Sequence, residues 1–401
     1  MPDGPDRPEA PHAAGGPGPS GGSDVPGVDA AALIRALARP RMTGSAGAAD
    51  VERDLRSHLM ALGYRVDLLP FTLSTWPAGL GVPVLAVILL VGAGAAWWSL
   101  RAGAPGCALL ASLAMAGVAA AGLLATPWAI LRLPFGRVRG CNWLARRSER
   151  PPALVVVAHR DSKSQAVPTL VRSAAAGLAI LGWATLLLAA ASALAGVAQP
   201  WLPHAGLAFS LIGGAGLLPA VTRNRSPGAL DNATGLAALL LAARDQREND
   251  DVGFLVTDAE EFGLAGAAAA AGRPPLDGVR AVINMDGLDD AGPMRVCDGH
   301  GFPVRDRAPV LTAAVAKACG DAGLATRTGT LPPGLLCDHI PFAAAGVPAV
   351  TLMRGRLASL ARVHRPSDTP DRLTGDGAEQ AARAVSRALD GLRRQGFATS
   401  H

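Results

Sequence analysis

The 401-residue sequence has few charged and few aromatic residues: 17% are charged and 4% are aromatic, although half of all residues are hydrophobic. Soluble globular chains carry about a quarter charged residues, so this deficit indicates that part of the chain lies in lipid. Lysine is almost absent, with only Lys163 and Lys317. No basic stretch is interleaved with aromatic residues, which leaves nucleic-acid binding without support.

The sequence also lacks CxxC and Walker motifs. Its five cysteines are an odd number, which favours reduced thiols in a cytosolic compartment over a disulfide framework. Cys337 stands beside Asp338 and His339, but adjacent residues do not give the geometry of a thiol protease. Residues 1–28 are rich in Pro, Gly, Ser and Asp, lack the apolar core of a signal peptide, and are predicted to be a disordered tail.

Three long uncharged stretches cover residues 77–100, 102–131 and 173–221. Each reaches the roughly 20 apolar residues that cross a bilayer, and the third is long enough for two crossings, interrupted at 199–203. We therefore predict four transmembrane helices arranged as two hairpins, with the lipid bilayer as a partner. The alternative is a large buried helical core in a soluble protein.

Arginine residues predict the orientation of these helices. The turn between the first two helices holds only Arg101, and the turn between the last two holds no Lys or Arg. The arginines that flank the hairpins on the side of the polar segments are Arg132, Arg137, Arg139, Arg146, Arg147, Arg172, Arg223 and Arg225. The positive-inside rule places both termini and the polar domain in the cytoplasm of a multi-pass plasma-membrane protein.

Outside the hairpins, short apolar runs typical of buried strands alternate with amphipathic helical segments. This alternation predicts an α/β sheet covered on both faces. The predicted divisions are a tail (1–28), three parts of one polar domain (29–76, 132–172 and 223–395), two membrane hairpins (77–131 and 173–222) and a C-terminal tail (396–401).

Acidic residues and histidines lie at the ends of the predicted strands. They are His159, the pair Glu260 and Glu261, Asp286 and His364, with Asp231 in a turn that leads into a helix. Because ligands of open α/β sheets bind outside the carboxyl ends of the strands, we expect these side chains to meet at one edge.

The residue types suit a pair of zinc ions. Two metal ions about 3.5–4 Å apart can hold a hydrolytic water and a substrate carbonyl together. One histidine and one carboxylate for each ion, with one shared carboxylate, leave each ion an open position. A further carboxylate is needed to take a proton from the water, and the adjacent Glu260 and Glu261 can fill both roles.

Six segments, taken in order, resemble the successive motifs of metallopeptidase family 28. They are HRDS (159–162), GALDNATG (228–235), DAEEFGLAG (258–266), INMDG (283–287), CDHIPFAAAGVPAV (337–350) and HRPSDT (364–369). The resemblance extends upstream to residues 43–66 and 141–147 and so covers nearly all of the polar domain. The family includes di-zinc aminopeptidases, carboxypeptidases of the glutamate type and glutaminyl cyclases.

The resemblance implies a zinc-exopeptidase-like fold, a mixed and mostly parallel sheet with helices on both faces, into which the two hairpins are inserted. It implies the following roles: His159 and Asp286 hold one zinc ion, Glu261 and His364 hold the second, Asp231 bridges them, Glu260 is the general base, and Asp161 orients His159. The sequence departs from the family pattern at Leu230, Arg160 and Arg365, and Arg365 is expected to alter how the substrate is held.

The expected function is a membrane-bound zinc metallopeptidase, with aminopeptidase activity on peptide substrates as the leading hypothesis. The alternatives are another amide hydrolase, a carboxypeptidase or a glutaminyl cyclase on the same site, or a catalytically silent membrane scaffold. The second hairpin interrupts the chain between His159 and Asp231. We therefore expect the site to favour peptides or amide-containing lipids that are presented near the membrane.

Overall fold

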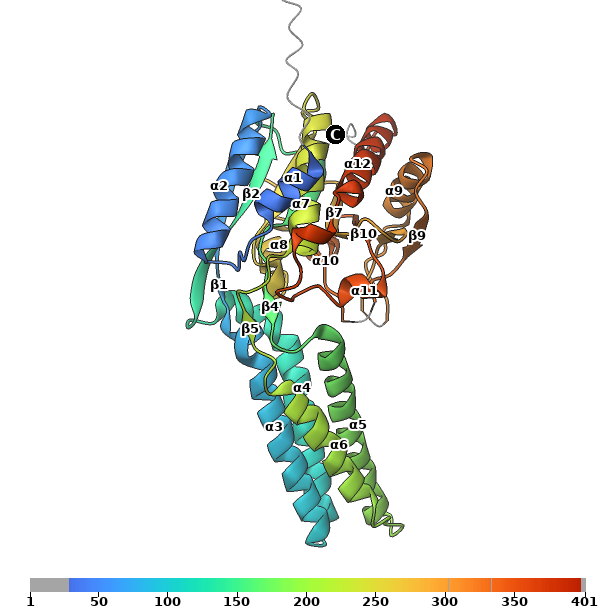
Figure 1. Cartoon of the computed structure of the whole chain (residues 1–401). Helices are drawn as coiled ribbons and strands as arrows, with labels where there is room; N and C mark the ends of the chain where they lie inside the picture. Colours follow the sequence, from blue (N-terminus) through green and yellow to red (C-terminus); the bar gives the residue numbers. More distant parts are fainter. Residues whose placement is uncertain (1–28, 302, 333, 398–401) are drawn as a thin grey trace, which may run out of the picture.

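The computed structural model describes residues 29–301, 303–332 and 334–397, so the predicted N-terminal tail and most of the C-terminal tail lie outside the described residues. These residues form a sheet domain joined to an elongated bundle of four helices (Figure 1). The two helical hairpins interrupt the chain of the sheet domain.

An eight-stranded sheet forms the centre of the domain, in the order β1-β2-β6-β3-β7-β10-β8-β9. The four strands at its centre are parallel: β6 (Val252–Thr257), β3 (Leu154–His159), β7 (Ala281–Leu288) and β10 (Ala349–Arg354). The remaining strands extend it on either side: β1 (Arg65–Ser74), β2 (Arg137–Arg146), β8 (Met294–Cys297) and β9 (Thr326–Gly329). β1, β2 and β8 pair antiparallel with their inner neighbours, and β9 pairs parallel with β8.

The central strands are mostly apolar because both faces of the sheet are covered. All six residues of β3 and of β6 are buried. One face packs against five helices: α1 (Ala30–Leu37), α2 (Ala46–Ala61), α7 (Thr234–Asp245), α9 (Pro309–Asp321) and α12 (Asp376–Arg394). The other face packs against α8 (Ala265–Ala270) and α10 (His339–Ala344). The predicted mixed α/β fold with helices on both faces is therefore confirmed.

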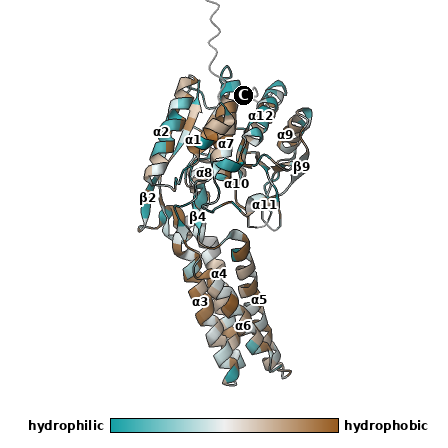
Figure 2. Cartoon of the chain, viewed as in Figure 1, coloured by the Kyte–Doolittle hydropathy of each residue, from teal (hydrophilic) through white to brown (hydrophobic). Residues whose placement is uncertain are grey.

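The bundle consists of two helical hairpins. The first contains α3 (Trp76–Arg101) and α4 (Pro105–Arg132), and the second contains α5 (Thr169–Leu194) and α6 (Leu202–Leu217). Apolar residues predominate along the helices of the bundle, as Figure 2 shows. Many of them lie on its outside: Val91, Leu110 and Ile180 are each more than 60% exposed. Such a surface suits contact with lipid tails rather than with water.

Among the described residues, three helices are long and apolar enough to cross a membrane, namely α3, α5 and the part of α4 from Pro105 to Gly122. The sequence predicted a fourth crossing that ends near residue 221, but α6 has only 16 residues and ends at Leu217. Pro219 has no backbone N–H with which to continue the helical hydrogen bonds, and Leu218, which still has helical backbone angles, caps the helix. The chain then forms the short strand β5 (Thr222–Arg223), which pairs with β4 (Ser164–Gln165).

The bundle lies beyond the edge of the sheet at which the parallel strands end. β3 ends at His159 and the chain reaches the start of α5 at Thr169, so the two are no more than about 35 Å apart. The β4–β5 pair lies at this junction between the domain and the bundle (Figure 1). The carboxyl ends of the central strands therefore face the helical hairpins.

Candidate metal centre

All five predicted metal ligands meet at the carboxyl edge of the sheet. His159 is the last residue of β3, and Asp286 lies within β7, two residues before the strand ends at Leu288. Glu261 lies in a short 3-10 turn that follows β6, and Asp231 lies in an irregular turn before α7. His364 follows β10 and the short helix α11 (Leu357–Leu360).

The ligand atoms form two groups that share Asp231. In the first, Nε2 of His159 lies 3.1 Å from Oδ1 of Asp231 and 3.7 Å from Oδ1 of Asp286. In the second, Nε2 of His364 lies 3.0 Å from Oδ2 of Asp231 and 3.0 Å from Oε2 of Glu261. Each group offers three ligand atoms that lie within 4.8 Å of one another. We call these the first and second metal positions.

The arrangement of these ligand atoms suits bound metal ions better than it suits hydrogen bonds among the side chains. Nε2 of His159 is buried and has no hydrogen-bond partner, although two carboxylate oxygens face it. A buried ring nitrogen without a partner is costly, and a cation between it and the carboxylates would satisfy both. Three carboxylates and two imidazoles suit zinc, which accepts nitrogen and oxygen ligands in a tetrahedral site.

The close packing of carboxylates and histidines shifts the pKa values of these side chains. Burial opposes ionisation of Asp231, but His159 and His364 outweigh it and hold the pKa of Asp231 well below its usual range. Burial lowers the pKa of His364, but the charge of Glu261 reverses this and brings it to about 9. Burial likewise lowers the pKa of His159, but the charge of Glu260 opposes this and the pKa is raised overall. Because metal ligands must be deprotonated, filling both metal positions would release the protons that the two histidines hold.

Glu260 is placed differently from the five ligands. It is 9% exposed, and among the described residues its carboxylate accepts no hydrogen bond. Burial raises its pKa well above the usual range, and the charge of His159 opposes the shift only in part. A carboxylate with free lone pairs and a raised pKa beside a metal centre is suited to proton transfer.

Asp161 contacts the site in another way than the sequence suggested. Its carboxylate accepts hydrogen bonds from the backbone N–H groups of Glu260, at 3.0 Å, and Glu261, at 3.1 Å. Nδ1 of His159 lies 3.1 Å from the backbone oxygen of Asp161 and 3.6 Å from its carboxylate. Asp161 thus holds the turn that carries Glu260 and Glu261, and it positions His159 chiefly through its backbone.

Two residues that support the site were not assigned from the sequence. Asp368 accepts hydrogen bonds from the backbone N–H groups of Leu230 and Asp231, at 2.9 and 3.1 Å. The fully buried guanidinium of Arg41 donates to the backbone oxygens of Arg160, Pro227 and Gly228. Asp368 belongs to the HRPSDT motif, which is a signal the sequence contains, whereas nothing in the sequence distinguishes Arg41 from other loop arginines.

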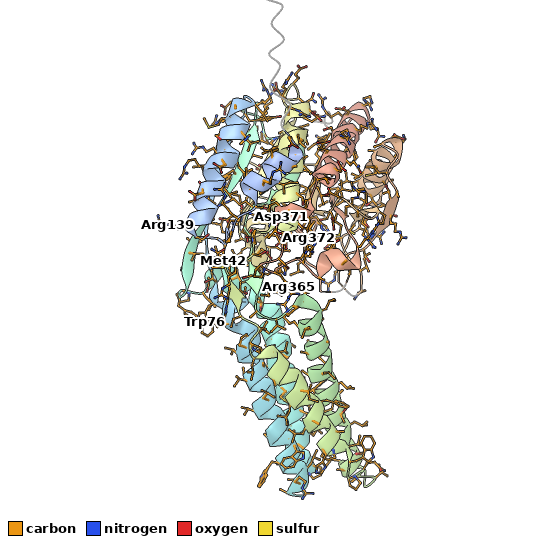
Figure 3. All side chains as sticks on the ribbon, viewed as in Figure 1. Met42, Trp76, Arg139, Arg365, Asp371 and Arg372 are labelled. Atoms are coloured by element: carbon orange, nitrogen blue, oxygen red, sulfur yellow. The ribbon has the colours of Figure 1, made fainter. Side chains whose placement is uncertain are left out.

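The three residues at which the sequence departs from the family pattern lie in three different environments. Arg160 points away from the metal positions, with Nη2 2.6 Å from Asp258 and its guanidinium 4.7 Å from the centre of the Trp143 ring. Leu230 is buried in the core. Arg365 is exposed on the side of the domain that faces the bundle (Figure 3).

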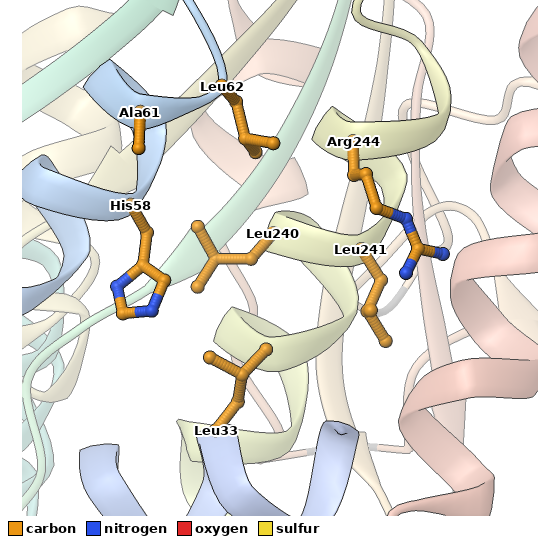
Figure 4. Close-up of a pocket in the computed structure, with 7 residues that line it drawn as sticks. All are labelled: Leu33, His58, Ala61, Leu62, Leu240, Leu241 and Arg244. Carbon is orange, nitrogen blue, oxygen red and sulfur yellow. The ribbon is translucent and has the colours of Figure 1, made fainter. Parts of the chain in front are cut away.

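A small apolar pocket between α1, α2 and α7 is separate from this site (Figure 4). Its lining includes Leu240, Leu241 and Arg244 from the second half of α7, whereas Asp231 precedes the start of that helix. At 1.5 Å per residue these lining residues are roughly 9–15 Å along the helix from its first residue, Thr234. It contains none of the predicted site residues.

The fold and the paired donor sets define an α/β protein of the zinc-exopeptidase type. A family model described as peptidase family M28 matches residues 143–389, which is more than half of the chain. The chain therefore belongs to peptidase family M28, and it is a zinc-dependent metallopeptidase by that membership. No curated protein matches the chain.

Solved structures with the same fold cover nearly the whole chain at low identity. The zinc aminopeptidase BSAP from Bacillus subtilis has a TM-score of 0.52 and 15% identity, over 90% of this chain and 94% of that one. A glutaminyl cyclase from Porphyromonas gingivalis has a TM-score of 0.53 and 15% identity, over 90% and 97%. A Zn-dependent exopeptidase from Parabacteroides distasonis has a TM-score of 0.52 and 13% identity, over 93% and 97%. At these identities the likeness establishes the fold alone.

Proposed function

We propose that the protein is a membrane-bound exopeptidase, most simply an aminopeptidase, whose metal centre holds two zinc ions. The observation that carries this proposal is the pair of three-ligand groups that share Asp231. His159 and Asp286 would hold one ion, and His364 and Glu261 would hold the other. A shared carboxylate supports two neighbouring metal ions rather than one.

When bound, the zinc ions would supply Lewis acidity, polarising the carbonyl of the scissile bond and lowering the pKa of water. Glu260 would take a proton from the attacking water and return it to the leaving nitrogen. Its raised pKa suits this transfer, because a more basic carboxylate accepts a proton more readily. Asp161 would hold Glu260 and Glu261 in place through their backbone N–H groups.

The decisive substitution is Glu260→Gln. Because Glu260 is outside both ligand groups, we expect the variant to bind as much zinc as the wild type and to lose activity by about a thousandfold or more. Zinc content of the detergent-purified protein and turnover of aminoacyl substrates measure the two effects. Full activity in the variant would refute the role of Glu260, and a wild type without zinc would favour the silent scaffold.

A second candidate reaction is glutaminyl cyclisation, because glutaminyl cyclases are among the solved structures with this fold. Carboxypeptidase or other amide hydrolase activity would use the same metal positions. A panel of substrates separates these reactions: unblocked peptides, peptides with a blocked amino terminus, and peptides that begin with glutamine. Release of an amino-terminal residue supports the aminopeptidase, and release of ammonia from the third set supports the cyclase.

We also propose that the two hairpins lie in the plasma membrane, with the peptidase domain and both termini in the cytoplasm. The apolar surface of the bundle and the arginines on the domain side support this orientation. The metal ligands at the strand ends then face the bilayer.

In this setting the preferred substrates are peptides or amide-containing lipids close to the membrane surface. The support is geometric, because the backbone N–H of Gln165, which leads into α5, donates to the backbone oxygen of His364 at 2.9 Å. In proteoliposomes, a lipid-anchored peptide should be cleaved about tenfold faster than the same peptide free in solution at equal bulk concentration. Equal rates would refute the preference without affecting the assigned chemistry.

A further inference from the structure

Lys163 lies beside the second metal position and has no assigned role. It follows His159 by four residues, in the segment that connects β3 to β4. Its Nζ lies 2.8 Å from Oε2 of Glu261 and 3.1 Å from the backbone oxygen of the same residue. Its backbone N–H donates to Oε1 of Glu261 at 3.2 Å. Lys163 thus engages both carboxylate oxygens of one metal ligand.

The same oxygen belongs to the second metal position. Oε2 of Glu261 lies 3.0 Å from Nε2 of His364, so the ammonium group and a metal ion would share this atom. The side chain of Lys163 is only 16% exposed and that of Glu261 only 2%, so water screens their interaction little. Two positive charges bound to one buried carboxylate repel each other.

The first metal position has no such neighbour. Among the described residues, no lysine or arginine forms an ion pair with Asp286 or with the shared Asp231. The buried guanidinium of Arg41 acts electrostatically on Asp231, and because both positions share that carboxylate, its charge does not distinguish them. The two positions therefore differ in the charge that surrounds them, although their ligand sets are alike.

We propose that Lys163 makes the two metal positions unequal in affinity. While only the first position is filled, its ammonium group is the counter-ion of Glu261 and keeps that buried carboxylate paired and in place. When the second position fills, the ammonium group opposes the incoming ion. The protein then holds one zinc ion tightly and a second one weakly. This inference rests on the proposed function, since it concerns the same metal centre.

The test is a zinc titration of the full-length protein in detergent, stripped of metal by a chelator and followed by calorimetry with a competing chelator. The wild type should bind two zinc ions with affinities that differ about tenfold or more. Lys163→Met removes the charge while keeping an apolar stem of similar length. It should tighten the weaker site about tenfold and leave the stronger site within a factor of about two.

Two control variants accompany it. Lys163→Arg keeps the positive charge and should retain two unequal sites. Lys317→Met removes the only other lysine, which is exposed on α9 and pairs with Asp321, and should titrate as the wild type does. Thermal unfolding of each metal-free variant checks that the fold is retained.

The outcomes separate this inference from the proposed function. Two sites of equal affinity in the wild type would overturn the role of Lys163 without any variant, and so would a Lys163→Met titration identical to that of the wild type. Either result leaves the two-zinc centre in place. A wild-type protein that binds no zinc would overturn both proposals.

Discussion

Two aspartates hold the turns that carry the metal ligands, and they do so in the same way. The carboxylate of Asp161 accepts the backbone N–H groups of Glu260 and Glu261, and that of Asp368 accepts those of Leu230 and Asp231. Turns outside regular structure leave such donors without partners, and buried donors need them. Burial raises the pKa of Asp368 to about 6 even though these hydrogen bonds oppose the shift. The ligands are thus positioned through their backbones.

His339 gives the fold a dependence on pH that is separate from the metal ligands. It is fully buried, Nδ1 lies 2.7 Å from Oγ1 of Thr351, and burial together with the charge of His300 lowers its pKa from 6.5 to about 4. The unfolded chain takes up a proton near pH 6.5, and the native protein takes it up only near pH 4. Acidification through this window therefore favours unfolding, by at most about 3 kcal/mol.

We expect His339→Asn, which can keep the contact to Thr351, to weaken this dependence. The thermal midpoint of the wild type should fall more between pH 7 and pH 4.5 than that of the variant. Both proteins are measured with a chelator present, so that loss of metal does not contribute. Parallel curves for the two proteins would show that His339 does not titrate as inferred.

Among the elements, the hairpin of α5 and α6 is packed through glycines. A Cβ atom added to Gly182 of α5 would lie 2.5 Å from the backbone nitrogen of Ser210 and 2.8 Å from the backbone oxygen of Gly206, both in α6. Such close approach of two backbones requires small residues, as in other membrane helix pairs. The hairpin in turn supports the site, since β4 and β5 at its base join the segments that lead from His159 and to Asp231.

Gly182→Leu should therefore separate the two helices and destabilise the protein by about 2 kcal/mol or more. Gly177 on the same helix is the matched control, because a Cβ atom there would meet nothing within 4 Å. Thermal midpoints and yields in detergent compare Gly182→Leu with Gly177→Leu. Equal stability of the two variants would contradict the packing described for this hairpin.

At the scale of the whole molecule, the peptidase domain and the far end of the bundle lie at opposite ends (Figure 1), so under the proposed topology they would lie on opposite sides of the membrane. Cys107, in the first turn of α4, is exposed and lies at the far end of the bundle. The other four cysteines lie in the domain, are half-buried or buried, and have pKa values raised chiefly by burial: Cys141, Cys297, Cys319 and Cys337. Their thiolate fractions at neutral pH are therefore small.

A membrane-impermeant maleimide added to intact cells should label the wild-type protein at Cys107 and should not label Cys107→Ser. This result is expected if the domain is cytoplasmic, because the turn between α3 and α4 is then outside the cell. Labelling of Cys107 only after the membrane is permeabilised would place the domain on the outside.

The sequence by itself determined which kinds of secondary structure the protein contains and which residues form its site. Alternation of apolar runs and amphipathic segments predicted the α/β sheet, and acids and histidines at strand ends predicted which residues would meet. Parallel strands place their carboxyl ends at one edge, so this conclusion followed from local patterns alone. The long uncharged stretches likewise predicted the four helices, because backbone groups in lipid must be satisfied within each helix.

Tertiary structure alone decided the finer arrangement, because it depends on contacts between segments far apart in the chain. The pairing of β5 with β4 joins two segments on either side of the second hairpin, and β8 and β9 were not predicted because four-residue strands carry little pattern of their own. The roles of Asp161 and Asp368 depend on which backbone donors lie within reach. The pairing of Lys163 with Glu261 joins residues 98 positions apart, and no local pattern in the sequence specifies such a contact.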